Sequence, residues 1–90
     1  MLQEQYPNRL SFLRKLRHLS QKQMAALIGL KDRTMIAKYE RGQVLPSLPV
    51  ESKMEIVFHA DGPDIFPKEF KQWNDEVEQV KETKFKHKQI

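Results

Sequence analysis

Residues 20–42 contain two short helical patterns separated by a glycine, and this arrangement limits the possible folds more than any other feature. Ser20 followed by Gln23 is the pattern of a capping box, in which each side chain accepts a hydrogen bond from the backbone amide of the other residue. We therefore expect a helix to begin at Gln21. Gly29 is expected to end it, because glycine adopts at no cost the left-handed conformation that closes a helix.

A second helix is expected after a short connection. The side chain of Asp32 can accept hydrogen bonds from amides two or three residues further on, which predicts a helix from Arg33 to Arg41. Both helices have apolar residues at helical spacing, beside the small Ala25; these are Met24, Leu27 and Ile28 in the first helix and Ile36 and Tyr39 in the second. Two short amphipathic helices joined by a turn form a helix-turn-helix.

The outer face of the second helix is polar, basic and narrow. It consists of Arg33, Thr34, Ala37, Lys38 and Arg41. Most charged helix faces are only solvated, but the short side chains of Thr34 and Ala37 let this face approach another surface closely. The major groove of DNA admits one α-helix, and arginine, lysine and threonine can reach its base edges and phosphates. We favour DNA binding over a solvated face.

These residues also resemble a known family. The string LSQKQMAALIGL followed by IAKYERG is similar to the Xre/Cro-type, lambda-repressor-like helix-turn-helix domain. The match is close over residues 19–42 and weaker from about residue 8 to residue 66. The chain departs from the pattern by one extra residue between Gly29 and Ile36. The resemblance implies an all-α, four- to five-helix DNA-binding domain, here with an added C-terminal helix.

The candidate DNA-binding residues follow from the polar face, the helix N-termini and the local charge. We expect Arg33, Thr34 and Lys38 to face the major groove, with Lys31 as a substitute if the helix begins earlier. Three further residues are expected to hold phosphates, namely Gln21, Arg41 and Gln43.

The resemblance implies one structural pair. The family carries an arginine in the first helix that pairs with the glutamate of its Tyr-Glu-Arg-Gly segment, and these positions are Arg14 and Glu40 here. A buried pair with two hydrogen bonds would hold the first helix against the recognition helix, whereas an exposed pair would contribute only about 0–1 kcal/mol. The sequence leaves the two alternatives open.

Charge is segregated along the chain. Residues 1–42 contain nine Lys/Arg and three Asp/Glu, a net +6, whereas residues 43–83 contain four and nine, a net −5. A basic half that ends where the motif ends suits a protein that presents one face to a polyanion. There is no cysteine, no apolar run near the ~20 residues of a membrane span and no secretory signal pattern, so we expect a cytoplasmic protein.

The flanking segments predict three more helices. A helix from Arg9 to about His18, with Asn8 as its N-cap, is expected to bury Leu10, Phe12, Leu13, Leu16 and Leu19. A helix from Pro49 to about His59, with Glu51 near the positive end of its dipole, has the apolar stripe Val50, Met54, Val57 and Phe58. Ile65 and Phe66 are expected to close the core, so that residues 1–66 form the DNA-binding domain.

Residues 67–90 form the added part. Pro67 begins a helix in which Phe70, Trp73, Val77 and Val80 make a narrow apolar stripe, followed by a basic tail. Two uses of the stripe stay open, a seam between two copies of the chain or packing against the chain's own core.

Catalytic and metal-binding patterns are missing from the sequence. His18, His59 and His87 have no metal-site spacing, and the three glycines are each expected to follow a helix singly. We expect neither an enzyme nor a cofactor. The hypothesis is a sequence-specific DNA-binding transcriptional regulator, repressor-like and homodimeric; the alternative is an antitoxin, with a toxin as protein partner, or an adaptor that uses the same fold to bind protein.

Overall fold

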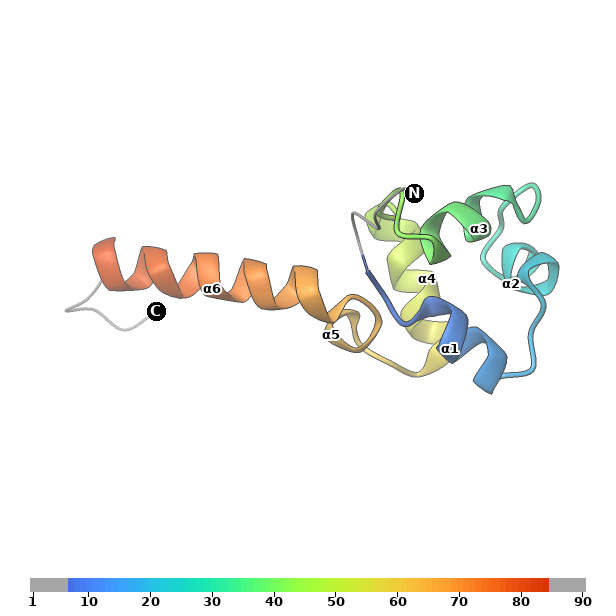
Figure 1. Cartoon of the computed structure of the whole chain (residues 1–90), viewed down its shortest axis with the longest axis horizontal. Coiled ribbons are helices and arrows are strands. Elements are labelled where there is room, and N and C mark those ends of the chain that lie inside the picture. The colour runs from blue at the N-terminus through green and yellow to red at the C-terminus, as the bar shows by residue number, and fades with distance from the viewer. Residues whose placement is uncertain (1–6, 85–90) are drawn as a thin grey trace.

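The computed structural model describes residues 7–84 of the chain. This part is entirely helical (Figure 1). The helices in order are α1 (Leu10–Leu16), α2 (Gln21–Leu27), α3 (Thr34–Glu40), α4 (Leu48–Phe58), α5 (Gly62–Ile65) and α6 (Pro67–Lys84). The predicted all-α, lambda-repressor-like class with an added C-terminal helix is confirmed.

The first five helices enclose one small core. Its buried apolar side chains are Leu10, Met24, Ala25, Ile28, Ile36, Tyr39, Met54, Phe58, Ile65 and Phe66. Every helix from α1 to α5 contributes to this set, so the core holds the helix-turn-helix in place. Ile65 and Phe66 are almost completely buried, which confirms the predicted closing segment.

The start of α1 differs in detail from the prediction. Arg9, and not Asn8, occupies the N-cap position, but the Asn8 side chain still serves the helix start. Its Oδ1 accepts a hydrogen bond from the Leu10 amide at 3.0 Å, and its Nδ2 donates to the Tyr39 carbonyl at 2.7 Å. Asn8 therefore joins the beginning of α1 to α3.

Three side chains expected in the core are exposed. Phe12 is 54% exposed and Leu16 and Leu27 are each 60% exposed, so their predicted burial is wrong. Helices α1 and α2 have only seven residues each, and only two residues of each helix are buried. The buried face is therefore narrower than the apolar pattern of the sequence suggests. The Arg9 guanidinium lies 5.0 Å from the centre of the Phe12 ring and partly shields it.

Gly62 was expected to follow a helix, but it is the first residue of α5. The preceding helix, α4, ends at His59, which itself adopts the left-handed conformation with φ of 51°. A Cβ atom on residue 62 would lie 2.2 Å from Cζ of Phe70. Glycine is needed here because it lets the Phe70 ring lie directly against the backbone of α5.

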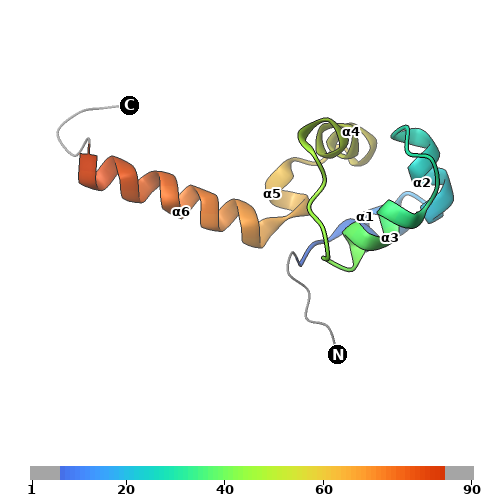
Figure 2. The same cartoon turned by 90° about the horizontal axis from the view of Figure 1, so that it is seen from above.

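Helix α6 extends away from the compact part of the molecule (Figures 1 and 2). The molecule is 50 Å long and 32 Å by 22 Å across. Phe70 packs against the core, whereas Trp73, Val77 and Val80 are exposed. Of the two uses left open for the stripe, packing against the chain's own core therefore applies to Phe70 but not to the three residues beyond it. The basic tail, with His87, and the first six residues lie outside the described residues.

Candidate nucleic-acid interface

The start of α2 is fixed by the predicted capping box. The Gln23 amide donates to Oγ of Ser20 at 3.0 Å, and the Ser20 amide donates to Oε1 of Gln23 at 2.8 Å. Two backbone donors that a helix start would leave unpaired are thereby satisfied. Helix α2 begins at Gln21, as predicted.

The turn between α2 and α3 comprises residues 28–33. Gly29 has a φ of +77°, and the Leu30 amide donates to the Ala25 carbonyl at 2.8 Å, which closes α2. Asp32 accepts a hydrogen bond from the Thr34 amide at 2.8 Å, so α3 begins at Thr34 with Arg33 as its N-cap residue. Helix α3 thus begins one residue later than the predicted start at Arg33, and the substitute register in which it begins earlier is not adopted.

Asp32 holds the start of α3 as an anion. Hydrogen bonds from the Thr34 side chain and then from the Thr34 amide lower the pKa of the Asp32 carboxyl, and the nearby Arg33 charge adds to this effect. The first amide of α3 is therefore already paired within the chain.

Arg14 and Glu40 form the predicted pair, and it is buried. Nε of Arg14 lies 2.6 Å from one carboxylate oxygen of Glu40 and Nη2 lies 3.2 Å from the other, while the two side chains are only 10% and 9% exposed. Nη1 of Arg14 also donates to the Leu19 carbonyl at 2.7 Å. Arg14 thus binds α3 and the segment that leads into α2 at the same time.

Two of the expected DNA-binding residues extend this network. Nε2 of Gln21 donates to Glu40 at 3.1 Å, and Oε1 of Gln21 accepts from Nη1 of Arg33 at 2.9 Å. The contacts therefore run from Arg14 through Glu40 and Gln21 to Arg33. Sequence reasoning had treated Gln21 and Arg33 as separate DNA contacts and had missed that they bind each other.

The polar face of α3 is accessible. Thr34, Lys38 and Arg41 follow each other at intervals of four and three residues, so they lie along one side of the helix, while Ile36 and Tyr39 are buried on the other side. Thr34 and Arg41 are exposed and Lys38 is half-buried. The structure brings these three residues together beside Arg33.

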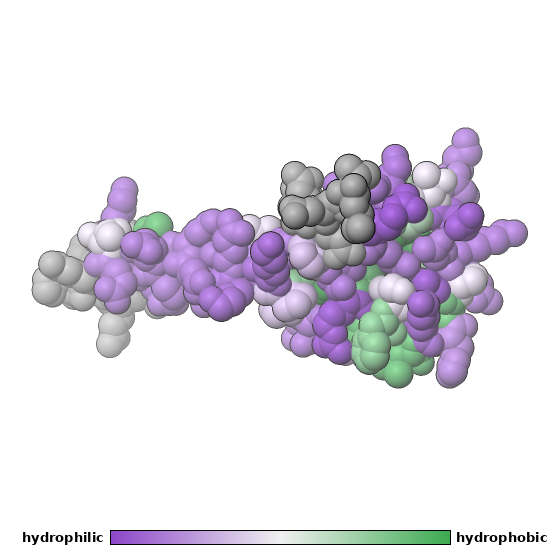
Figure 3. All heavy atoms as spheres, in the orientation of Figure 1, coloured by the Kyte–Doolittle hydropathy of each residue, from purple (hydrophilic) through white to green (hydrophobic). Residues whose placement is uncertain are grey.

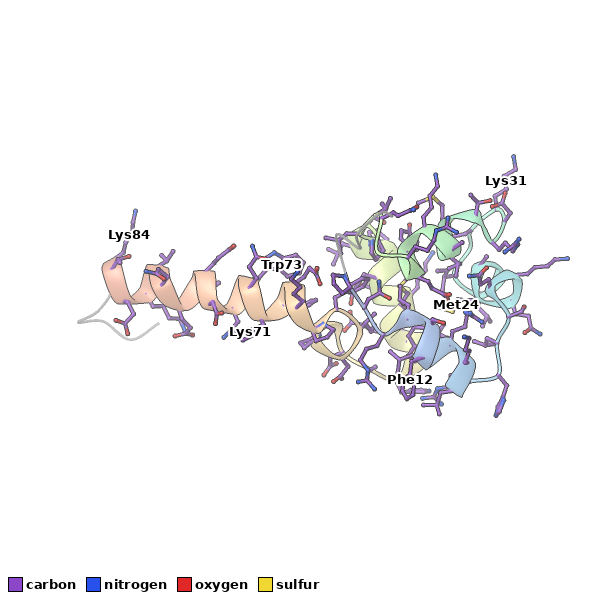
Figure 4. The ribbon with its side chains drawn as sticks, in the orientation of Figure 1. Phe12, Met24, Lys31, Lys71, Trp73 and Lys84 are labelled. Atoms are coloured by element: carbon purple, nitrogen blue, oxygen red, sulfur yellow. The ribbon has the colours of Figure 1, made fainter. Side chains whose placement is uncertain are left out.

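The two remaining candidates lie at either end of α3. Lys31 is exposed in the turn and points away from the domain (Figure 4). Gln43 is exposed after Gly42, whose φ of +70° lets the Gln43 amide donate to the Lys38 carbonyl at 3.1 Å. Both side chains therefore lie exposed at the two ends of the polar face of α3.

Within residues 7–84 no group of three or more histidine, aspartate or glutamate side chains is placed to hold a metal ion. No helix in the same part of the chain has the length and apolar character needed to cross a membrane. Burial raises the pKa of the Tyr39 hydroxyl, as expected for a core residue of α3.

Two short helices held at a fixed angle, with a basic face on the second, define the class of DNA-binding helix-turn-helix domains. The family model HTH_3, described as helix-turn-helix, matches residues 10–59, from the start of α1 to the end of α4. The chain belongs to this Xre/lambda-repressor-like helix-turn-helix family. A search of curated proteins gives no match. The family is DNA-binding and non-enzymatic, which supports a DNA-binding regulator.

Proposed function

We propose that the chain is a sequence-specific transcriptional regulator that binds operator DNA, repressor-like, through α3. The observation that carries this proposal is the accessible basic face of a helix whose other side is fixed by the core and by the buried Arg14–Glu40 pair. A rigid support matters because a base contact depends on the position of the reading helix in the groove. A cytoplasmic location is part of the proposal, since such a regulator acts where its DNA lies.

The proposed site divides into two roles. Thr34 and Lys38 lie on the middle of the exposed face and read base edges, with Arg33 held beside them by Gln21. Arg41, Gln43 and Lys31 lie at the ends of this face and hold phosphates. In this scheme Gln21 positions Arg33. Its own contact with a phosphate is made while it stays hydrogen-bonded to Glu40 and Arg33. Residues 1–66 form the DNA-binding unit, and residues 67–90 are an added helix and tail.

The first experiment measures DNA binding by fluorescence anisotropy with random duplex at two salt concentrations. Binding through this face must weaken as salt rises, because phosphate contacts release counterions. Arg41→Ala is expected to reduce the slope of log affinity against log salt by about one, for all sequences alike. Lys71→Ala removes the same charge from the exposed surface of α6 and serves as the matched control.

A selected duplex then tests base reading. Lys38→Ala is expected to lose about 1–3 kcal/mol of binding free energy and to relax the preference at one base position. Arg33→Ala is expected to do the same at a neighbouring position. If neither change affects specific binding, the face of α3 is not the reading surface.

A second function, a protein-binding adaptor or antitoxin on the same fold, is favoured by one observation. Phe12 and Leu16, one turn apart on α1, are both more than half exposed. Figure 3 shows an apolar area low on the domain, where Figure 4 labels Phe12. Exposed apolar patches mark protein-binding surfaces. Absence of salt-dependent DNA binding would leave this function as the better one.

A further inference from the structure

The outer half of α6 carries an apolar stripe that nothing in residues 7–84 covers. Trp73, Val77 and Val80 are 42%, 54% and 47% exposed, and they follow each other at intervals of four and three residues. The Trp73 ring packs edge-on against Phe70, with 5.0 Å between ring centres. The stripe therefore begins at the domain and continues along the projecting helix (Figures 1 and 4).

A hollow of about 220 Å³ lies at the root of this stripe. Phe70 and Trp73 form one wall, and Leu48 and Glu51 from the start of α4 are on the other. Leu48 is 77% exposed. Oε1 of Glu51 is buried and has no hydrogen-bond partner among the described residues. The hollow thus combines apolar walls with a buried carboxyl group.

We propose that α6 pairs antiparallel with α6 of a second copy of the chain, so that each helix end enters the other copy's hollow. Val77 then packs against the partner's Val80, and the partner's Val77 packs against Val80. In an antiparallel pair, the residue numbers of two facing seam residues always have the same sum. Residues 73 and 84 have the same sum as residues 77 and 80, so this register places the partner's Lys84 opposite Trp73. Its ammonium group meets the face of the Trp73 ring and lies beside the Glu51 carboxyl group, where it favours the charged form of that group.

Self-complementarity is the reason for choosing a second copy as the occupant. The apolar stripe ends in a cation, and the hollow at its root has apolar walls and a carboxyl group. A two-fold axis between the helices satisfies both ends at once, as in an isologous interface. The residues on either side of the apolar seam are compatible with this pairing. On one side Glu76 lies near the partner's Thr83, and on the other side Asn74 lies near the partner's Lys81, so no like charges face each other.

The start of α4 decides the direction of the pair. Leu48 and Glu51 line the same hollow as Trp73, so a partner helix on the stripe meets this part of the domain. A parallel partner would bring its own domain to the same level, where the two domains would collide. Charge alone would also permit the parallel pair, since Glu76 would then lie beside the partner's Lys81. The antiparallel pair avoids the collision and puts the domains at opposite ends.

The inference specifies the homodimer expected from the sequence but does not depend on the proposed DNA binding, and it is tested without DNA. Sedimentation equilibrium of the full chain is expected to show a dimer. Val77→Asp is expected to weaken self-association roughly tenfold or more, because it places a charge in the seam. Gln79→Asp, off the stripe on the same helix, is the matched control and should leave the dimer unchanged. Circular dichroism checks that both variants keep their helices.

Direction is tested by thiol cross-linking, because the chain has no cysteine of its own. A Leu48→Cys chain mixed with a Lys84→Cys chain is expected to form a mixed dimer with a short bis-maleimide. Lys84→Cys alone should not cross-link to itself, since the two residues 84 lie at opposite ends. Efficient self-cross-linking of Lys84→Cys, a monomeric full chain at high concentration, or equal effects of Val77→Asp and Gln79→Asp would each overturn the proposal.

Discussion

Arg14, on α1, binds two other parts of the domain through one guanidinium group. It contacts both carboxylate oxygens of Glu40 on α3 and the Leu19 carbonyl before α2, and all of this takes place in a nearly solvent-free position. A buried ion pair is weak evidence for stability as a whole, but loss of one partner leaves the other charge unpaired. The pair therefore matters more for the orientation of α3 than for the free energy of folding.

Arg14→Ala is expected to lower the free energy of unfolding by about 3–5 kcal/mol, because Glu40 is left buried without its cation. Thermal unfolding followed by circular dichroism measures the change. Lys15→Ala, on the exposed side of the same helix, is the matched control. A double-mutant cycle with Glu40→Gln isolates the coupling, and a value near zero would mean that the two side chains do not depend on each other.

Glu51 is the most perturbed carboxyl group among the described residues. Burial, with the neighbouring Glu55 carboxyl adding to it, raises the pKa of Glu51 from 4.5 to about 7. The position near the positive end of the α4 dipole, which favours the charged form, is outweighed by the loss of solvent. The folded chain holds this proton more tightly than the unfolded chain does.

This pKa predicts how stability depends on pH. The contribution of protonated Glu51 is fully present below the unfolded pKa of 4.5 and is lost as the pH rises through about 7. Glu51→Gln is expected to remove this loss. Between pH 5 and pH 8 its free energy of unfolding should therefore rise, relative to that of the natural chain, by on the order of 1 kcal/mol, allowing for the partial exposure of Glu51. Urea unfolding of dilute protein at several pH values measures the difference.

The matched control for this pH profile is Glu82→Gln, at an exposed position on α6. Its effect should be the same at every pH between 5 and 8. Parallel profiles for the natural chain and Glu51→Gln would show that Glu51 titrates like an ordinary surface carboxyl.

At the scale of elements, the sequence predicted what local chemistry determines. The capping box at Ser20, the glycine that ends α2 and the start of α6 at Pro67 are all where the residues placed them. These features depend on neighbours within four residues, so a single stretch of sequence contains the information. The burial of Arg14 and Glu40 depends on how α1 and α3 meet, and it was left open for that reason.

The errors share one cause. Leu16 and Leu27 fit a helical apolar stripe. Such a stripe shows which residues lie on one side of a helix, but not how much of that side the neighbouring helices cover. The role of Gly62 was equally hidden, because it depends on the Phe70 ring eight residues away. The pairing of Gln21 with Arg33 depends on the angle between α2 and α3, which the sequence does not give.

The junction of α5 and α6 supplies a prediction of its own. Gly62→Ala is expected to lower the free energy of unfolding by about 1–3 kcal/mol, because the new Cβ overlaps the Phe70 ring and forces it to move. Trp73 is the only tryptophan and contacts that ring, so its fluorescence should change as well. Phe70→Leu in the same chain should restore part of the loss. Equal destabilisation with and without Phe70→Leu would rule out this contact as the cause.

At the scale of the whole molecule, two surfaces lie at opposite ends. The basic face of α3 belongs to the half with net charge +6, and α6 belongs to the half with net charge −5. Figure 1 shows α6 extending from the side of the domain opposite to α2. A helix that projects away from the basic face leaves its apolar stripe available for the second copy.

The proposed pairing predicts the length of the dimer. One chain is 50 Å long, and an antiparallel overlap of residues 73–84 covers about 18 Å at 1.5 Å per residue, so the dimer should be roughly 80 Å long. A parallel pair would keep a length of roughly 50 Å and increase in width only, because both domains would lie at the same end. Small-angle X-ray scattering at a concentration where the chain is dimeric separates the two. Val77→Asp should return the maximum dimension to that of one chain, and a dimer as short as the monomer would exclude the antiparallel arrangement.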